Sequence, residues 1–476
     1  MTTSLRTGTV DSPRRWHRRL SAGAGLAVLA TSFLLGGAKL ADSAMAAPAA
    51  TTQWLGYHGG ANGAGAAVGI SSVNTTSAKW TSPVLDGQVY AEPLVYAHEV
   101  VVATENNSVY ALSSGTGAVL WHKHLAPAVP SRELPCGNIS PLVGISGTPV
   151  IDPVRHEVFA LAFEVAGGVP VHYVWGLNVN NGALMLRRAL STPTPDQLPY
   201  LNRSGLALSH GSIIYTFGGN YGDCETYHGV VGALKETGAK VGSFVVDSAS
   251  GQSQGAVWMG GAAPAIDAAG NVWVTSGNGS VTSSGRPYDH SDGVLELTST
   301  MHLKSFFAPS NWAQDNASDA DLSAEPAVLS NGLVVATGKS GHIYLLRASH
   351  LGGVGGQIST IDSNCGDVLD GGFSLHGRIL FLPCMSGTEA VRVTSSPAAV
   401  KVIWHASVGS GPPVMAAQLV WTIGSDGVLY GLNPDNGKVV QRAPLGSLAN
   451  HFSTPSVGAG LLLAPISQRV VAFSAT

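Results

Sequence analysis

Alternating apolar and polar positions recur along the chain in one short phrase. Residues 109–121 read VYALSSGTGAVLW, residues 428–440 read VLYGLNPDNGKVV, and a looser copy, VWGLNVNNGALML, stands at 174–186. Each copy has an apolar run, a polar turn with glycine, and a second apolar run. Glycine supplies the positive φ that a tight turn requires, so each copy predicts a β-hairpin. Hairpins that recur at intervals of about 40–60 residues predict a radial or solenoidal repeat.

The inner strand of each repeat is expected to begin near a small residue, in most copies followed by proline. Eight such anchors stand 41–62 residues apart: Glu92-Pro93, Thr148-Pro149, Gly205-Leu206, Ala263-Pro264, Glu325-Pro326, Gly371-Gly372, Pro412-Pro413 and Thr454-Pro455. They predict an all-β protein, an eight-bladed β-propeller with four antiparallel strands in each blade. Seven blades are the alternative, if the weak third or sixth repeat forms none.

The last repeat is short. Residues 453–473 have room for only three strands. We expect residues 77–81, from the N-terminal side, to supply the fourth strand. A ring closed by strands from both ends of the chain has no open sheet edge.

Several repeats are longer than a propeller blade requires. A bare blade needs about 40 residues, so the excess forms loops, and one of these, residues 308–324, reads PSNWAQDNASDADLSAE. Binding and catalytic residues lie mostly on loops that a rigid scaffold positions. We therefore expect function on the loop-decorated face rather than in the strands.

Composition supports an all-β protein and narrows its partners. Of the 476 residues, 11% are charged and 60 are glycine, whereas charged residues make up about a quarter of a typical globular protein. The formal net charge is −4, and no basic run follows the first twenty residues. Nucleic-acid binding is therefore not expected. We expect a monomer that binds a small molecule or a protein.

The first 46 residues have the pattern of an export signal. Arginines precede an apolar stretch at residues 20–37, and Ala44-Met45-Ala46 places small residues at a cleavage site. General secretion and, from the paired arginines, twin-arginine export are both open as the route; an uncleaved membrane anchor is the alternative. No other stretch approaches the roughly 18–20 apolar residues of a membrane span. The predicted parts of this secreted or cell-envelope protein are a signal peptide at 1–46, an extension at 47–76 and one propeller at 77–476.

Four cysteines, Cys136, Cys224, Cys365 and Cys384, allow three disulfide pairings. The 19-residue separation of the last two suits adjacent strands of one blade. We therefore expect Cys365–Cys384, which leaves Cys136–Cys224 to join two loops in an oxidising compartment. No CxxC spacing is present, so zinc binding and thioredoxin-like chemistry are not indicated.

Three polar features lie in one block of the chain. Residues 276–280, SGNGS, are either a glycine-rich turn or a place where Asn278 offers its side-chain oxygen to a hard cation. Asp319 and Asp321 are either residues of a solvated loop or a general base over a central pocket, beside a calcium ion. Lys339 either caps a turn or directs a fixed positive charge at an anionic ligand.

The order of these features resembles one family. Residues 258–279 read WMGGAAPAIDAAGNVWVTSGNG, and WAQDNASDADLSAEPAV and GKSGHIYLL follow. This order resembles the quinoprotein alcohol dehydrogenases and their relatives, the proteins of the PQQ-like propeller repeat. Insertions such as residues 220–224 are similar to those of exported actinobacterial propellers. The resemblance implies eight four-stranded blades, with pyrroloquinoline quinone (PQQ) and calcium over the axis in the enzymes; non-catalytic scaffolds such as the outer-membrane assembly lipoprotein share the repeat.

The resemblance also implies residue roles. Asn278 corresponds to the family's metal-ligand asparagine, and Glu164 lies near its calcium-ligand glutamate if a gap is allowed. Asp319 or Asp321 resembles the catalytic aspartate. Lys339 resembles the basic residue that contacts the quinone oxygens.

The chain also departs from the dehydrogenases. They stack a tryptophan beneath the quinone, where this chain has Gly260 and Gly261; Trp258, slightly earlier, is the candidate cofactor-binding tryptophan. They also place two adjacent cysteines against the cofactor, and this chain has no two adjacent cysteines. These losses remove most of the apolar contact that holds a planar ring.

The sequence therefore favours an exported propeller that binds a ligand or partner without redox chemistry. A calcium- and PQQ-dependent dehydrogenase acting on an alcohol or sugar is the alternative, and whether the protein is an enzyme stays open. Propellers serve many unrelated functions, so the fold alone does not decide.

Overall fold

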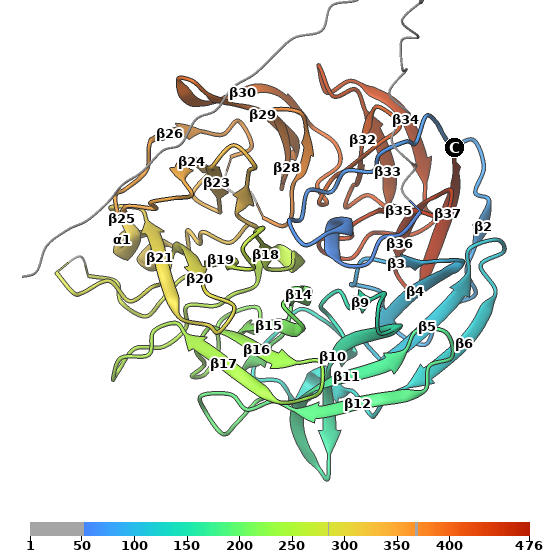
Figure 1. Ribbon diagram of the computed structural model, residues 1–476, viewed down its shortest axis with the longest axis horizontal. Helices are drawn as coiled ribbons and strands as arrows, with labels where there is room; N and C mark the ends of the chain where they lie inside the picture. Colours follow the sequence, from blue (N-terminus) through green and yellow to red (C-terminus); the bar gives the residue numbers. More distant parts are fainter. Residues whose placement is uncertain (1–51, 284, 367–369) are drawn as a thin grey trace, which may run out of the picture. The chain divides into compact units, whose positions relative to one another are not determined.

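The computed structural model describes residues 52–283, 285–366 and 370–476, whose strands form eight antiparallel blades around one axis (Figure 1). The predicted export signal lies outside the described residues. Each inner strand begins within two residues of its predicted anchor. The eight-bladed propeller is confirmed, and the seven-bladed alternative is wrong.

In the first four blades, the strands follow one another in sequence from the axis outward. Blade 1 contains β3 (Leu94–Tyr96), β4 (Glu99–Thr104), β5 (Ser108–Ser113) and β6 (Val119–His124). Blade 2 contains β9 (Val150–Asp152), β10 (Glu157–Ala166), β11 (Val169–Asn178) and β12 (Leu184–Ala189). Blade 3 contains β14 (Ala207–Ser209), β15 (Ser212–Gly219), β16 (Val230–Lys235) and β17 (Lys240–Val245). Blade 4 contains β18 (Ala265–Ile266), β19 (Val272–Ser276), β20 (Gly293–Leu297) and β21 (Leu303–Ala308).

The remaining blades follow the same order. Blade 5 contains β22 (Ala327–Val328), β23 (Leu333–Thr337), β24 (His342–Arg347) and β26 (Ser359–Asp362). Blade 6 contains β27 (Ser374–His376), β28 (Ile379–Cys384), β29 (Gly387–Ser395) and β30 (Ala398–Ala406). Blade 7 contains β31 (Val414–Ala416), β32 (Leu419–Ile423), β33 (Val428–Leu432) and β34 (Val439–Pro444). Blade 8 contains β35 (Ser456–Gly458), β36 (Leu461–Ile466) and β37 (Arg469–Ala475).

The connections carry the short elements. These are β7 (Val129–Pro130), β8 (Leu142–Val143), β13 (Tyr200–Leu201), β25 (Gly353–Val354), the 3-10 helices η1 (Tyr57–Gly59), η2 (Ser131–Glu133) and η3 (Met259–Gly261), and the α-helix α1 (Trp312–Ser318). The insertion at residues 308–324 is therefore partly helical.

Both ends of the chain close the ring. Strands β1 (Val73–Asn74) and β2 (Trp80–Thr81) pair antiparallel with β37. The N-terminal side thus supplies the outer part of blade 8. The fourth strand that we expected from residues 77–81 is β2.

Indole rings join neighbouring blades. In three places the outer strand of one blade lays a tryptophan on the positive-φ glycine of the next blade's outer turn, so closely that a Cβ on that glycine would lie 2.5–2.7 Å from the ring. The indole Nε1 also donates a hydrogen bond of 2.8–2.9 Å to a carbonyl of that turn. The three pairs are Trp80 with Gly117, Trp121 with Gly182 and Trp404 with Gly437.

The extension before the ring fills its axis. Residues 54–67 exchange backbone hydrogen bonds of 2.7–2.9 Å with inner strands of blades 1, 2, 4, 6 and 7, at Val95, Ile151, Ile266, Leu375 and Met415. Tyr57 and His58 of this segment stack with their ring centroids 4.2 Å apart, and both are buried. Figure 1 shows the segment at the centre of the ring. The axial channel is therefore not an open pore.

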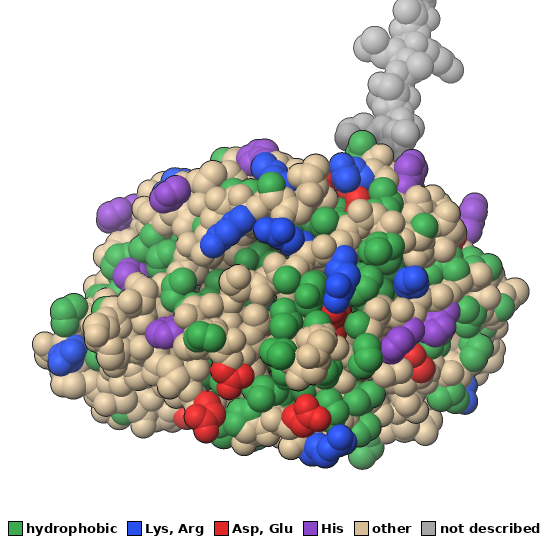
Figure 2. Space-filling view, turned by 90° about the horizontal axis from the view of Figure 1, so that it is seen from below, with side chains coloured by type: hydrophobic (Ala, Val, Ile, Leu, Met, Phe, Trp, Pro, Cys, Tyr) green, Lys and Arg blue, Asp and Glu red, His purple; other side chains and the backbone are tan. Residues whose placement is uncertain are grey.

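The surface seen in Figure 2 carries basic and acidic side chains scattered among hydrophobic and neutral ones. This agrees with the low charged fraction of the sequence. Among the described residues, no helix has the length and apolar character needed to cross a membrane.

We expect the indole joints to carry much of the stability. Trp404→Ala should lower the free energy of unfolding by about 3–5 kcal/mol, because it removes a large ring and its packing. Trp404→Phe, which loses mainly the hydrogen bond to Pro434 O, should cost less. Gly437→Ala should also destabilise, because φ at residue 437 is 70° and the ring leaves no room for a Cβ. Urea unfolding of the three variants checks this order, and equal effects of Ala and Phe would contradict it.

Candidate functional site

Two kinds of connection meet at one end of the axis. One kind leads from each outer strand to the next inner strand, and the other joins the second and third strands of a blade. We call this end the connection face. Asn278 and Lys339 lie in connections of the second kind, after β19 and β23, and Asp319 and Asp321 lie before β22.

The structure brings four predicted residues together. The Asn278 backbone N–H donates to Asp321 Oδ1 at 2.6 Å, and Asn278 Nδ2 donates to Asp319 Oδ1 at 2.8 Å. Lys339 Nζ lies 3.0 Å from Asp319 Oδ1 and 2.5 Å from Asp321 Oδ2. We call these four residues the axial cluster. Asn278 Oδ1 is buried and has no hydrogen-bond partner.

Burial and pairing set the electrostatics of the axial cluster. The Asp321 side chain is 0% exposed, whereas that of Asp319 is 70% exposed. Burial raises the pKa of Asp321, although Lys339 and the Asn278 N–H oppose this. Burial also lowers the pKa of Lys339, but the pairing with Asp321 and Asp319 outweighs it and holds that pKa above its usual value. The cluster thus keeps one cation against one buried and one exposed carboxylate.

Asp319 stands where α1 ends. Its φ is 56° and its ψ 41°, and its backbone N–H donates to Asp315 O. Aspartate visits this left-handed conformation more readily than most residues. The helix end therefore places the Asp319 carboxylate at the surface, beside Lys339.

The other two predicted residues lie differently. Trp258 Nε1 donates to Gly219 O at 2.8 Å, and a Cβ on Gly277 would lie 2.8 Å from the indole and 2.6 Å from Asp321 Oδ1. Trp258 therefore packs at the edge of the axial cluster, against backbone. Glu164 lies on β10 of blade 2, outside the cluster.

The partners of Glu164 are those of a structural residue. It forms an ion pair with Arg187 and accepts a hydrogen bond of 2.9 Å from Trp175 Nε1. Arg187 in turn stacks over Tyr173 and Trp175. No oxygen of Glu164 is directed at Asn278 in these contacts.

A buried arginine was not predicted from the sequence. Arg203, before β14, donates from Nη1 to Ser146 O at 3.2 Å and from Nη2 to His451 O at 2.9 Å. Its guanidinium carbon lies 5.4 Å from the Tyr90 ring centre and 5.5 Å from that of Phe452. These residues come from connections of different blades, so Arg203 ties the connection face together across the axis.

Two carboxylates act on Arg203 electrostatically. They are Glu105, after β4, and Asp370, before β27. Glu105 accepts from Gly144 N at 2.7 Å and from Ser146 Oγ at 3.0 Å, yet burial raises its pKa to about 7. Burial also raises the pKa of Asp370, to about 6. No linear motif marks any of the three residues.

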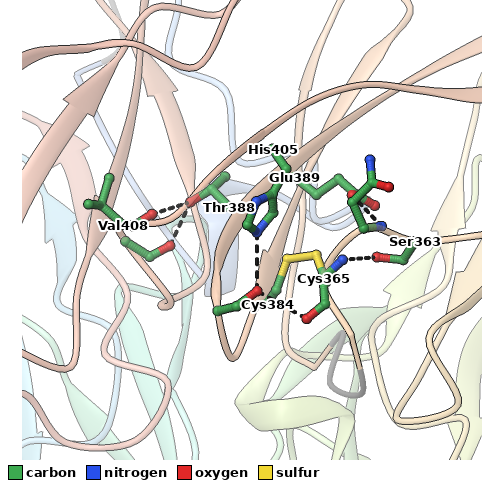
Figure 3. The surroundings of a disulfide bond; sticks show 10 residues. Ser363, Cys365, Cys384, Thr388, Glu389, His405 and Val408 are labelled. Carbon is green, nitrogen blue, oxygen red and sulfur yellow. Dashed lines mark hydrogen bonds between the residues drawn. A yellow bond between two sulfur atoms is a disulfide. The ribbon is translucent and has the colours of Figure 1, made fainter.

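Both predicted disulfides are present, Cys136–Cys224 and Cys365–Cys384. Cys384 ends β28, but Cys365 lies in the connection before blade 6 rather than on an adjacent strand. His405 lies beside this bond and approaches Ser386 Oγ at 3.1 Å (Figure 3). The ligand atoms of Cys365, Cys384 and His405 lie within 4.8 Å of one another, but the disulfide occupies both sulfurs. Two disulfides fit an oxidising compartment.

The other disulfide fixes a loop on the connection face. It joins the connection between blades 1 and 2 to the one between β15 and β16. Seven residues of this loop line a surface hollow of about 240 Å³: Ser131, Arg132, Leu134, Gly137, Asn138, Ile139 and Ser140.

Comparison with known proteins places the fold. Residues 70–195 match the model of the family described as outer membrane protein assembly factor BamB. Among solved structures, a europium-containing methanol dehydrogenase is similar with a TM-score of 0.67 and 13% identity, covering 89% of this chain and 98% of that one. A quinohemoprotein alcohol dehydrogenase from Pseudomonas putida HK5 gives 0.64 and 11%, covering 89% and 80%.

BamB from Moraxella catarrhalis is also similar, with a TM-score of 0.54 and 15% identity, covering 85% of this chain and 98% of that one. No curated protein sequence matches the chain. At these identities the likeness shows the fold, which is a PQQ-like β-propeller.

The ion pair within the axial cluster can be tested by a double-mutant cycle. Lys339→Met should lower the free energy of unfolding by about 3 kcal/mol at neutral pH, because it leaves the buried Asp321 carboxylate without its cation. Asp321→Asn in the same protein should recover part of this loss. Urea unfolding of the two single variants and the double variant measures the coupling. Additive effects would show that the pair contributes nothing.

Glu105 should make stability depend on pH. Its folded-state pKa of about 7 lies above the ordinary 4.5, so folding favours the protonated form. This contribution is fully present below about pH 4.5 and is lost as the pH rises through 7, by about 3 kcal/mol in total. Glu105→Gln should remove this slope. Unfolding curves of both proteins between pH 4 and pH 8 check it, and parallel pH profiles would contradict it.

Proposed function

We propose that this PQQ-like β-propeller is an exported binding protein that docks a ligand or a protein partner on its connection face, without redox chemistry of its own. One observation carries the proposal: Lys339 and Asp319 stand partly exposed at the centre of this face, held there by buried partners. A charged pair held in a fixed geometry offers both a donor and an acceptor to a polar ligand. Because the two side chains are already held in place, binding costs little conformational entropy, and this favours affinity.

Other parts of the ring also favour the connection face as the docking site. Residues 54–67 occupy the axis along the inner strands, so the axis offers no passage to a ligand. Arg203 fixes several connections relative to one another. The loop bearing Cys136 adds further surface there. The likeness to BamB, an outer membrane protein assembly factor, makes a protein partner a reasonable expectation for this chain.

A quinoprotein dehydrogenase is the second candidate, and the assembly of the axial cluster favours it. The polar residues fit: Asn278 Oδ1 is buried and unpartnered, and Lys339 lies beside Asp321. The contacts for a planar ring do not fit. The Trp258 indole is packed against Gly277. The two disulfides join cysteines that are 88 and 19 residues apart, so neither is the bond between adjacent cysteines that the dehydrogenases place against the cofactor. The missing ring contacts therefore favour the binding protein over the dehydrogenase.

The docking face can be tested with a matched pair of variants. Asp319→Arg changes an exposed side chain of the axial cluster, and Val154→Arg changes a residue that is 86% exposed in the inner turn of blade 2, away from the connection face. Tagged wild-type protein should retain a specific component of the secreted and envelope fraction of its source, identified by mass spectrometry. We expect Asp319→Arg to lose that component about tenfold and Val154→Arg to retain it.

Two outcomes would contradict the proposal. Equal retention by both variants would place docking elsewhere. Stoichiometric binding of PQQ with calcium, together with dye reduction by alcohols or sugars that Asp321→Asn abolishes, would establish the dehydrogenase instead.

A further inference from the structure

A row of buried carboxylates continues from the axial cluster into the protein. Asp292 and Asp289 lie in the connection between β19 and β20 of blade 4, and Asp247 follows β17 of blade 3. Their exposed fractions are 0%, 3% and 0%. The Asp247 backbone N–H donates to Asp289 O at 3.2 Å. Asp247 interacts electrostatically with both Asp289 and Asp292, so two blades bring these buried carboxylates near one another.

Most of their oxygens have no partner. Asp289 Oδ1 accepts from the N–H and hydroxyl of Ser291, and Asp292 Oδ1 accepts from Leu322 N at 3.2 Å. Both oxygens of Asp247, Oδ2 of Asp289 and Oδ2 of Asp292 are buried without a hydrogen bond. The Tyr288 hydroxyl nearby is also unpartnered.

No basic side chain balances these charges. Among the described residues, none of the three aspartates forms an ion pair, and Lys339 is already held by Asp319 and Asp321. A buried carboxylate without a counter-charge costs several kcal/mol, and neighbouring carboxylates also repel one another. Asp247 is fully buried with both oxygens free, so either a cation or a proton must neutralise it; burial and the neighbouring carboxylates raise its pKa to about 9.

Glycine backbone lies close against the free oxygens of Asp289 and Asp247. A Cβ on Gly279 would lie 2.8 Å from Asp289 Oδ2, and a Cβ on Gly255 would lie 2.9 Å from Asp247 Oδ2. The Gly255 N–H donates to Asn278 O at 2.7 Å, so the two glycine segments run side by side. Both carboxylates thus face bare backbone where larger residues would intrude.

We propose that Asp247 and Asp289 bind one calcium ion between blades 3 and 4, with Asp292 supplying a third negative charge. The ligands are all oxygen, which suits a hard cation and not a soft transition metal. Calcium tolerates irregular coordination and gives up its water readily, whereas magnesium keeps several waters and demands near-octahedral geometry. Complete burial therefore favours calcium over magnesium.

This site is separate from the side chains of the axial cluster. The calcium ion would anchor one end of the connection from residue 277 to residue 292, and Asn278 stands at its other end. The ion would thereby hold the connection face in shape. The inference does not depend on whether the propeller binds a partner or a quinone.

The test uses purified protein stripped with a chelator and dialysed against calcium-free buffer. We expect 1 mM calcium to raise the midpoint of thermal unfolding by about 5 °C, and 1 mM magnesium to raise it much less. Equilibrium dialysis with radioactive calcium should give one tightly bound ion per chain.

Isosteric variants locate the ion. Asp247→Asn and Asp289→Asn should each abolish the bound calcium and the calcium-induced shift, and should raise the midpoint of the calcium-free protein, because they relieve repulsion between carboxylates. Asp435→Asn, a change of the same kind in an exposed turn, should leave binding unchanged.

Three results would overturn the proposal. The first is an absence of calcium binding by the wild type, which would mean that Asp247 and Asp289 share a proton instead. The second is calcium binding that survives both Asp247→Asn and Asp289→Asn. The third is calcium binding that is lost in Asp321→Asn but kept in Asp247→Asn, which would place the ion in the axial cluster.

Discussion

The ring depends on one repeated contact, an indole that lies on a glycine turn of the next blade. Each blade satisfies its own backbone hydrogen bonds, so the sheets themselves do not specify how blades are arranged. The tryptophan fixes this arrangement because its ring fits only where the turn has no Cβ, and because its N–H needs the carbonyl of that same turn. Trp80 makes this contact from the N-terminal strand. The closure of the ring therefore uses the same joint as two interfaces within it, that between blades 1 and 2 and that between blades 6 and 7.

This local rule explains why the fold could be predicted from the sequence. The glycine of each hairpin phrase, such as Gly117 with φ of 73°, marks a turn that the surrounding strands require, and the eight anchors before the inner strands give the number of blades. Long-range contacts leave no such mark. Arg203 donates to a carbonyl 248 residues away, and only the closed ring brings the two together. Glu164 matched a family position by spacing, but strand pairing placed Trp175 and Arg187 against it.

The axial cluster shows a second limit of the sequence. Turn, cap and ligand were alternative interpretations for its members, and the structure shows that a position at a helix end can also take part in a cluster of charged contacts. Asp319 ends a helix and also accepts from Asn278 and Lys339. A residue type that suits a left-handed helix end is also one that carries charge. Sequence patterns identify such positions without saying which role prevails.

The backbone N–H groups of buried connections need hydrogen-bond acceptors, and this need accounts for the position of several buried carboxylates. Strands pair their N–H groups with neighbouring strands, but a buried connection must find another acceptor for each of its N–H groups. Carboxylates meet this need in three connections: Glu92 accepts from His58 N, Glu105 from Gly144 N, and Asp321 from Asn278 N. Burial raises the pKa of Glu92 and of Glu105, so these two carboxyls are favoured in their protonated form, whereas Asp321 lies against the Lys339 cation. The polar centre of the connection face thus follows from holding the loops in place, which leaves a charged, rigid surface on which binding can evolve.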